Sequence, residues 1–176
     1  DSRGRFYPRT YGLSPQGSDL QKALLHAAYG KPVNTPDAIK WFHVQGANKF
    51  GFDKAPLADR HKWVVDRQDL ILSFADDPIN NQGWTEADKP LQFLAWCFEY
   101  ADYVRDTTGS FISRIPISMD GSCNGLQNLS AMTRDEIGGA ATNLVPGAGM
   151  EDIYRRVAEA ATARLLAADE PDDDTL

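Results

Sequence analysis

The chain has 176 residues, of which 42% are hydrophobic and 10% aromatic, and its net charge is −7. This content is enough for one sizeable core and argues against disorder over most of the length. No apolar run approaches the roughly 20 residues that a membrane-spanning helix needs, so no membrane partner is expected.

The negative charge is concentrated at the C-terminal end. Residues 169–176 hold five acidic side chains, and removing these five charges would leave a net charge of −2. We therefore expect residues 1–168 to fold and residues 169–176 to form an acidic, solvated tail or linker. The first residue is not methionine, and the first segment already has a structured composition, which indicates a piece of a longer polypeptide.

Helices dominate the elements predicted in the first half. Residues 3–12 mix arginine with aromatic residues and are interrupted by Pro8, which predicts an extended or edge segment. Capping signals and apolar spacing then predict three helices. These helices cover residues 18–29, 35–48 and 58–75.

The second half combines helices with one strand region. A helix is predicted over 90–104, and its expected apolar face consists of Leu91, Leu94, Phe98 and Ala101. The β-branched residues of 110–120 predict one or two short antiparallel strands. Helices over 126–132 and 151–167 are separated by a predicted glycine-rich loop over 138–149. The fold class is therefore expected to be α+β and mostly helical.

The strand region ends on an acidic residue followed by a turn of small residues. Asp120 precedes Gly121, and a carboxylate at a strand end beside an exposed glycine carbonyl suits Mg²⁺, which prefers hard oxygen ligands. Ser122 and Asn124 are expected to cap the helix that follows. The alternative is that Asp120 is itself only a helix cap, as aspartate often is. Spacing alone leaves both interpretations open.

Two basic segments also have a functional and a structural interpretation. Arginines interleaved with aromatic residues in "RGRFYPR" suit a phosphate backbone with stacked bases, and the alternative is an edge strand with surface charges. Lys54, in "GFDKAP", has the reach to contact a phosphate, although an isolated lysine in a loop is usually only solvated.

Four stretches, taken in order, resemble one protein family. They are "DSRGRFYP" with "SPQGSDLQKALL", then "HVQGANKFGFDKAPLADR", "WCFEYA" and "PISMDGSCNGLQNLSAMTRDEIGG". Together they resemble the single-subunit, bacteriophage-type DNA-directed RNA polymerases over nearly the whole chain except the acidic tail. The resemblance implies a central fragment of a right-hand polymerase fold. Residues 1–168 would then comprise part of the palm, with a short antiparallel palm sheet, and its surrounding helices.

The resemblance also implies roles for the residues at the strand end. Asp120 corresponds to one of the two aspartates that bind the catalytic Mg²⁺ ions, and the Gly121 carbonyl helps to hold one ion. The reaction implied is nucleotidyl transfer by a two-magnesium mechanism. The second aspartate lies outside this chain, so the fragment alone is expected to be inactive.

The resemblance implies further contacts with nucleic acid and nucleotide. Arg5 and Tyr7, and with them Arg3, correspond to positions near the template and the RNA–DNA hybrid. Lys54 corresponds to a contact with the phosphates of the incoming nucleotide. The expected partners are a DNA template, the RNA product, ribonucleoside triphosphates and the remainder of the polymerase chain.

Two functions from other classes remain as alternatives. One is a nucleic-acid-binding module without chemistry, and the other is an unrelated Mg²⁺-dependent hydrolase in which Asp120 pairs with Asp135 or Glu136. The expected location is the bacterial cytoplasm, as for a phage enzyme, with a mitochondrial or plastid parent as the alternative.

Overall fold

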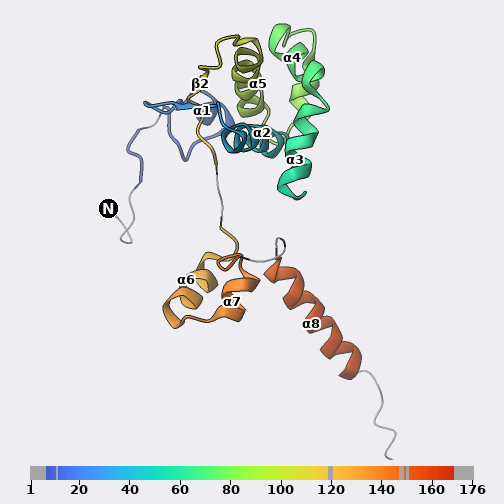
Figure 1. Cartoon of the computed structure of the whole chain (residues 1–176). Coiled ribbons are helices and arrows are strands. Elements are labelled where there is room, and N and C mark those ends of the chain that lie inside the picture. The colour runs from blue at the N-terminus through green and yellow to red at the C-terminus, as the bar shows by residue number, and fades with distance from the viewer. Residues whose placement is uncertain (1–6, 11, 119–120, 147–148, 150, 169–176) are drawn as a thin grey trace, which may run out of the picture. The chain divides into compact units, whose positions relative to one another are not determined.

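The computed structural model describes residues 7–10, 12–118, 121–146, 149 and 151–168. The chain divides into two compact units, Asp1–Ser118 and Met119–Leu176. The described residues are mostly helical and include one two-stranded antiparallel sheet (Figure 1), which confirms the α+β prediction. No helix among these residues is long and apolar enough to cross a membrane. The predicted tail, 169–176, lies outside the described residues.

The first unit holds most of the regular structure. In chain order its elements are α1 (Asp19–Ala23), β1 (Lys31–Pro32), α2 (Pro36–Phe50), α3 (Leu57–Val65), α4 (Gln68–Asp76), the 3₁₀ helix η1 (Gln82–Glu86), α5 (Pro90–Arg105) and β2 (Ile112–Ser113). β1 pairs with β2, so that Lys31 lies opposite Ser113 and Pro32 opposite Ile112. The sheet is much shorter than the strand region predicted over 110–120.

An aromatic core forms where α2 packs on α5. Trp96 is fully buried, and its indole Nε1 donates a hydrogen bond to the carbonyl oxygen of Phe42 at 2.9 Å. A β-carbon at Gly46 would lie only 2.3 Å from the Trp96 ring. The two helices therefore approach each other at a point where only glycine fits.

The buried face of α5 differs from the predicted one. Phe98 is 44% exposed, and Leu91 and Leu94 are only half-buried. The buried side chains of this helix are Phe93, Trp96, Cys97, Tyr100 and Ala101. Because α5 is apolar around most of its circumference, spacing alone could not select the face, and the aromatic residues of α2 select it instead.

Two other predicted helices have different limits. The capping box between Ser18 and Gln21 forms as expected, but α1 ends at Ala23 rather than near residue 29. The chain beyond it runs beside the β2 segment, where the Ala27 N–H donates to the Arg114 carbonyl oxygen at 2.8 Å. This long-range pairing replaces the last turns of the predicted helix.

The helix predicted over 58–75 is divided into α3 and α4 around Arg67. This residue has φ −116° and ψ 16°, outside the helical range, and its guanidinium lies 4.9 Å from the centre of the Trp63 ring. The break allows Val64 of α3 and Ile71 of α4 both to be buried in the same core.

The second unit consists of α6 (Asn124–Thr133), α7 (Glu136–Ala141) and α8 (Ile153–Ala168). α7 includes residues 138–141, which belong to the predicted loop of 138–149, and Gly138 lies in a close contact with α6. A β-carbon at Gly138 would lie 2.5 Å from Oγ of Ser130, which is buried on α6. Asp135 caps α7 by accepting a hydrogen bond from the Ile137 N–H at 3.0 Å.

Candidate functional site

The segment that leads to Asp120 is held on α2 by side chains. The Gln45 amide donates to the Pro116 carbonyl oxygen at 2.9 Å and accepts from the Ser118 N–H at 3.3 Å. One helical turn later, Lys49 Nζ donates to Ser118 Oγ at 2.9 Å. Gln45 is only 1% exposed. Three hydrogen bonds from one helix face thus fix residues 116–118, where no strand pairing is present among the described residues.

The segment that follows Asp120 enters α6 through an unusual backbone conformation. Cys123 has φ 54° in the left-handed region, and its side chain does not cap the helix. The predicted caps are not formed as expected, because Asn124 is already the first helical residue. Ser122 Oγ instead accepts a hydrogen bond from Asn143 Nδ2 at 3.3 Å. A non-glycine residue in this conformation is uncommon and usually depends on its surroundings.

Asn143 connects this segment to the start of the last helix. Its Nδ2 also donates to the Glu151 carbonyl oxygen at 2.7 Å, and its Oδ1 accepts from the Glu151 N–H at 2.8 Å. Gln127 Nε2 donates to the Thr142 carbonyl oxygen at 2.6 Å. The residues after Asp120 are therefore tied to the α7 end and to the approach to α8.

The candidate residues taken from the sequence are only partly described. Asp120, Arg3 and Arg5 lie outside the described residues. Tyr7 is 51% exposed. The Lys54 side chain is 91% exposed, and its Nζ lies 3.7 Å from Oδ2 of Asp53, so it is held only weakly. Tyr7 and Lys54 both face solvent.

The described residues contain no cluster of three or more His, Cys, Asp or Glu side chains that could hold a metal ion. Asp135, one of the two acids considered for a hydrolase, is occupied as the cap of α7. The hydrogen bond that Asp135 accepts at the start of this helix favours a structural role for its carboxylate.

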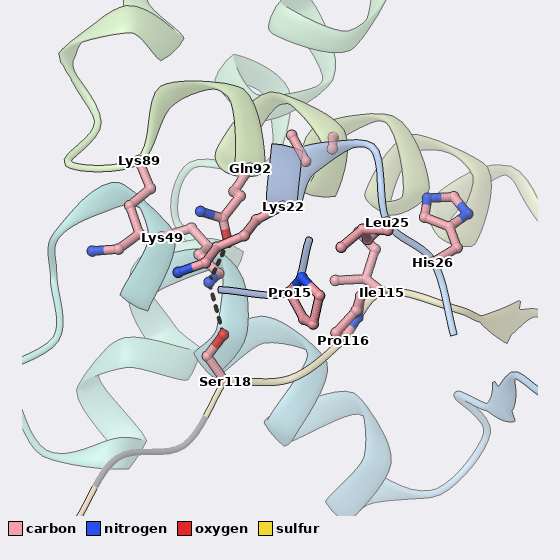
Figure 2. A pocket seen from close by; sticks show the side chains of 12 residues that line it. Pro15, Lys22, Leu25, His26, Lys49, Lys89, Gln92, Ile115, Pro116 and Ser118 are labelled. Carbon is pink, nitrogen blue, oxygen red and sulfur yellow. Dashed lines mark hydrogen bonds between the residues drawn. The ribbon is translucent and has the colours of Figure 1, made fainter. Parts of the chain in front are cut away.

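Sequence reasoning missed a basic cavity in the first unit, here called the lysine cavity (Figure 2). Its volume is about 260 Å³. Its basic lining residues are Lys22, Lys49, Lys89 and His26. Its other walls are Pro15, Ala23, Leu25, Gln92, Ala95, Ile115, Pro116 and Ser118. The lysines come from α1, α2 and the residue before α5, and no local sequence pattern connects them.

Lys49 is the buried member of this cavity, with 7% of its surface exposed. Its Nζ donates to Gln92 Oε1 at 2.7 Å as well as to Ser118. Burial, followed by the positive charges of Lys89 and Lys22, lowers the pKa of Lys49 below its usual range, and the Asp19 carboxylate opposes this shift.

Asp19 has partners of its own at the start of α5. Its Oδ2 accepts from the Leu91 N–H at 2.7 Å, and its Oδ1 accepts from Gln92 Nε2 at 2.9 Å. The carboxylate therefore caps α5 and lies beyond ion-pair distance of the three lysines.

Comparison with known proteins identifies the family. A family model described as DNA-dependent RNA polymerase matches residues 32–175. The chain belongs to this RNA polymerase family. It is 45% identical to the DNA-directed RNA polymerase of Enterobacteria phage T3 and 43% identical to T7 RNA polymerase of Escherichia phage T7, each over 159 residues. It is 41% identical over 161 residues to the mitochondrial DNA-directed RNA polymerase of Schizosaccharomyces pombe.

These matches cover 90% of this chain but only 18%, 18% and 14% of the three polymerases. The chain thus spans less than a fifth of the length of these relatives. The polymerase resemblance found in the four sequence stretches is confirmed. Phage and mitochondrial polymerases are both among the relatives, so both expected origins remain compatible with the matches.

Proposed function

We propose that this chain is the part of a DNA-directed RNA polymerase, in the palm of a right-hand fold and its surrounding helices, that carries one of two metal-binding aspartates. The observation that carries the proposal is the family match over residues 32–175, which includes Asp120. The hydrogen bonds that hold residues 116–118 on α2 support it, because a catalytic group needs a rigid frame. The full-length polymerase would act on a DNA template and ribonucleoside triphosphates and release RNA.

The Asp120 carboxylate and the Gly121 carbonyl are the groups of this chain that would hold Mg²⁺, because both offer hard oxygen ligands. Two bound ions would activate the RNA 3′-hydroxyl and stabilise the departing pyrophosphate. This chemistry needs at least two carboxylates, and Asp120 would be the one that this chain supplies. The remainder of the polymerase would contribute the second aspartate, so the isolated chain is expected to be inactive.

Other residues of this chain would position its partners. Gln45 and Lys49 orient the segment before Asp120 through Pro116 and Ser118. The exposed Lys54 is free to reach the phosphates of an incoming nucleotide.

At the N-terminal end, Arg3, Arg5 and Tyr7 would contact the template or the RNA–DNA hybrid, and the half-exposed Tyr7 ring is accessible for stacking. We place the parent enzyme in the bacterial cytoplasm as a phage polymerase, with a mitochondrial or plastid enzyme as the alternative. Residues 169–176 would form a solvated acidic segment.

The test is run-off transcription by the full-length polymerase with Asp120→Asn. This change keeps the size of the side chain and removes its charge, so RNA synthesis should fall at least ~100-fold while template binding is retained. Asp135→Asn is the matched control, since asparagine caps a helix as well as aspartate does, and it should transcribe normally. Normal synthesis by Asp120→Asn would contradict the proposal. Loss of transcription in Asp135→Asn with unchanged stability would show that Asp135 contributes to the reaction beyond capping α7.

A further inference from the structure

The lysine cavity concentrates positive charge that has no ion-pair partner among the described residues. Among the residues that the structure describes, no carboxylate oxygen lies within 4.0 Å of a nitrogen of Lys22, Lys49 or Lys89. The nearby Asp19 is engaged by the first turn of α5. A buried cation without a counter-charge is costly, and proteins usually pair it. The cavity therefore has the electrostatics of an anion-binding site.

The geometry of Lys49 supports the same conclusion. An ammonium group has three N–H donors, and two of those on Lys49 are directed to Gln92 and Ser118. Its third donor has no acceptor within the described part of the chain. Lys22 and Lys49 extend into the same part of the cavity, with Lys89 at its edge (Figure 2). Their side chains can therefore donate to one ligand from different directions.

We propose that the lysine cavity binds a phosphate group. Phosphate offers several strong acceptor oxygens, so more than one ammonium group can bind it at once. Lysine suits this role because its ammonium group acts as a point charge on a flexible side chain. A metal cation is excluded by the three positive charges. The volume of about 260 Å³ lies just below the range for a whole small-molecule ligand, so it fits a phosphate with the atoms next to it rather than a complete nucleotide.

The apolar part of the lining indicates what adjoins the phosphate. Pro15, Leu25, Ile115 and Pro116 face the same cavity as the lysines. An apolar wall beside a charged group suits a sugar next to a phosphodiester. Free pyrophosphate and a nucleic-acid strand share the phosphate chemistry, and the experiment distinguishes these two sources.

The first measurement is lysine acylation of the full-length protein, read for each residue by peptide mass spectrometry in metal-free, low-salt buffer. The probes are inorganic pyrophosphate and, separately, a short single-stranded oligodeoxynucleotide. Binding should slow acylation of Lys22 and Lys89, whereas Lys62, whose side chain is 69% exposed on α3, should react at its usual rate. Protection by both probes identifies a site open to free phosphate compounds. Protection by the oligonucleotide alone identifies a strand phosphodiester.

The second measurement uses Lys49→Met, with Lys62→Met as the matched control. Removal of one charge-assisted contact should raise the probe concentration that protects Lys22 by about tenfold to a hundredfold, and the control should leave it unchanged. Equal acylation rates with and without both probes would overturn the proposal, as would equal protection of Lys62 or an unchanged concentration dependence in Lys49→Met. The wild-type acylation result stands even if the variant folds poorly.

The proposal does not rest on polymerase activity. Asp120→Asn should lower transcription at least ~100-fold and leave protection of Lys22 and Lys89 intact. Failure of one proposal is therefore distinguishable from failure of the other.

Discussion

At the scale of single residues, His43 shows how strongly burial changes chemistry in this chain. Its ring lies on α2, stacked on His61 with centroids 4.7 Å apart, and neither of its nitrogens has a hydrogen-bond partner among the described residues. Burial, and after it the nearby His61, lowers the pKa of His43 from 6.5 to about 4. His43 is therefore a neutral core residue at neutral pH.

This lowered pKa predicts acid sensitivity. Because the folded-state pKa lies below the unfolded value, the unfolded chain binds more protons as the pH falls. The contribution of His43 to stability is complete above pH 6.5 and is lost as the pH falls toward 4. At pH 4.5 the free energy of unfolding should have decreased by roughly 2 to 3 kcal/mol from this residue alone.

Urea unfolding of the wild type and His43→Phe at pH 7 and 4.5 measures this contribution. Between pH 7 and 4.5 the free energy of unfolding should decrease less in His43→Phe than in the wild type. The difference between the two decreases should be roughly 2 to 3 kcal/mol. An equal loss in wild type and His43→Phe would show that other groups cause the acid sensitivity.

At the scale of elements, α2 makes two different contacts with two of its faces, one with residues 116–118 and one with α5. Gln45 and Lys49, one turn apart, hold the segment before Asp120. Gly46 lies on another face, against the Trp96 ring of α5. The packing of α2 on α5 therefore sets the position of residues 116–118 relative to the core of the first unit.

Gly46→Ala tests this close approach. The added methyl group would meet the Trp96 ring at 2.3 Å, and overpacking of this kind costs about 1–3 kcal/mol. The gain in helix propensity, about 1 kcal/mol, should offset only part of that cost. Thermal unfolding should show a lower Tm.

The control is Gly125→Ala in α6, where a β-carbon would meet nothing within 4 Å. That variant should keep or raise the Tm, because alanine favours the helix. An unchanged or higher Tm in Gly46→Ala would mean that α2 and α5 can move apart without a loss of stability.

At the scale of the whole molecule, the chain shows surfaces typical of part of a larger protein. It spans less than a fifth of the length of its polymerase relatives. α8 exposes four large apolar side chains by 60–69%, namely Tyr154, Val157, Leu165 and Leu166. We expect the remainder of the polymerase chain to cover this helix, since a soluble protein rarely leaves such a face open.

Leu165→Lys tests the covering of α8. In the full-length polymerase a lysine at this position would be buried without a partner, and the Tm should fall by several degrees. Thr162→Lys adds the same charge at an exposed polar position of the helix and should have little effect. Equal Tm values for the two variants would show that this part of α8 stays exposed in the longer protein.

The sequence by itself determined the features that depend on neighbouring residues. The start of α2 follows from Thr35, whose side chain caps the Ala38 N–H, and the Ser18–Gln21 capping box starts α1. Proline at the first position marks the start of α5. The polymerase family was also evident, because four motifs occur in order along the chain. Caps and motifs act within a few residues, so the sequence shows them directly.

The tertiary structure alone decided the features that depend on distant residues. α1 ends early because residue 27 pairs with residue 114, and the buried face of α5 follows from its contact with α2. α7 forms in a glycine-rich stretch because Gly138 allows close contact with Ser130 of α6. The lysine cavity joins Lys22, Lys49 and Lys89, which are far apart in the sequence. The burial of a side chain and the electrostatic potential around it depend on all residues that are close in space. Many of these residues are distant in the sequence, so a local sequence pattern cannot predict either quantity.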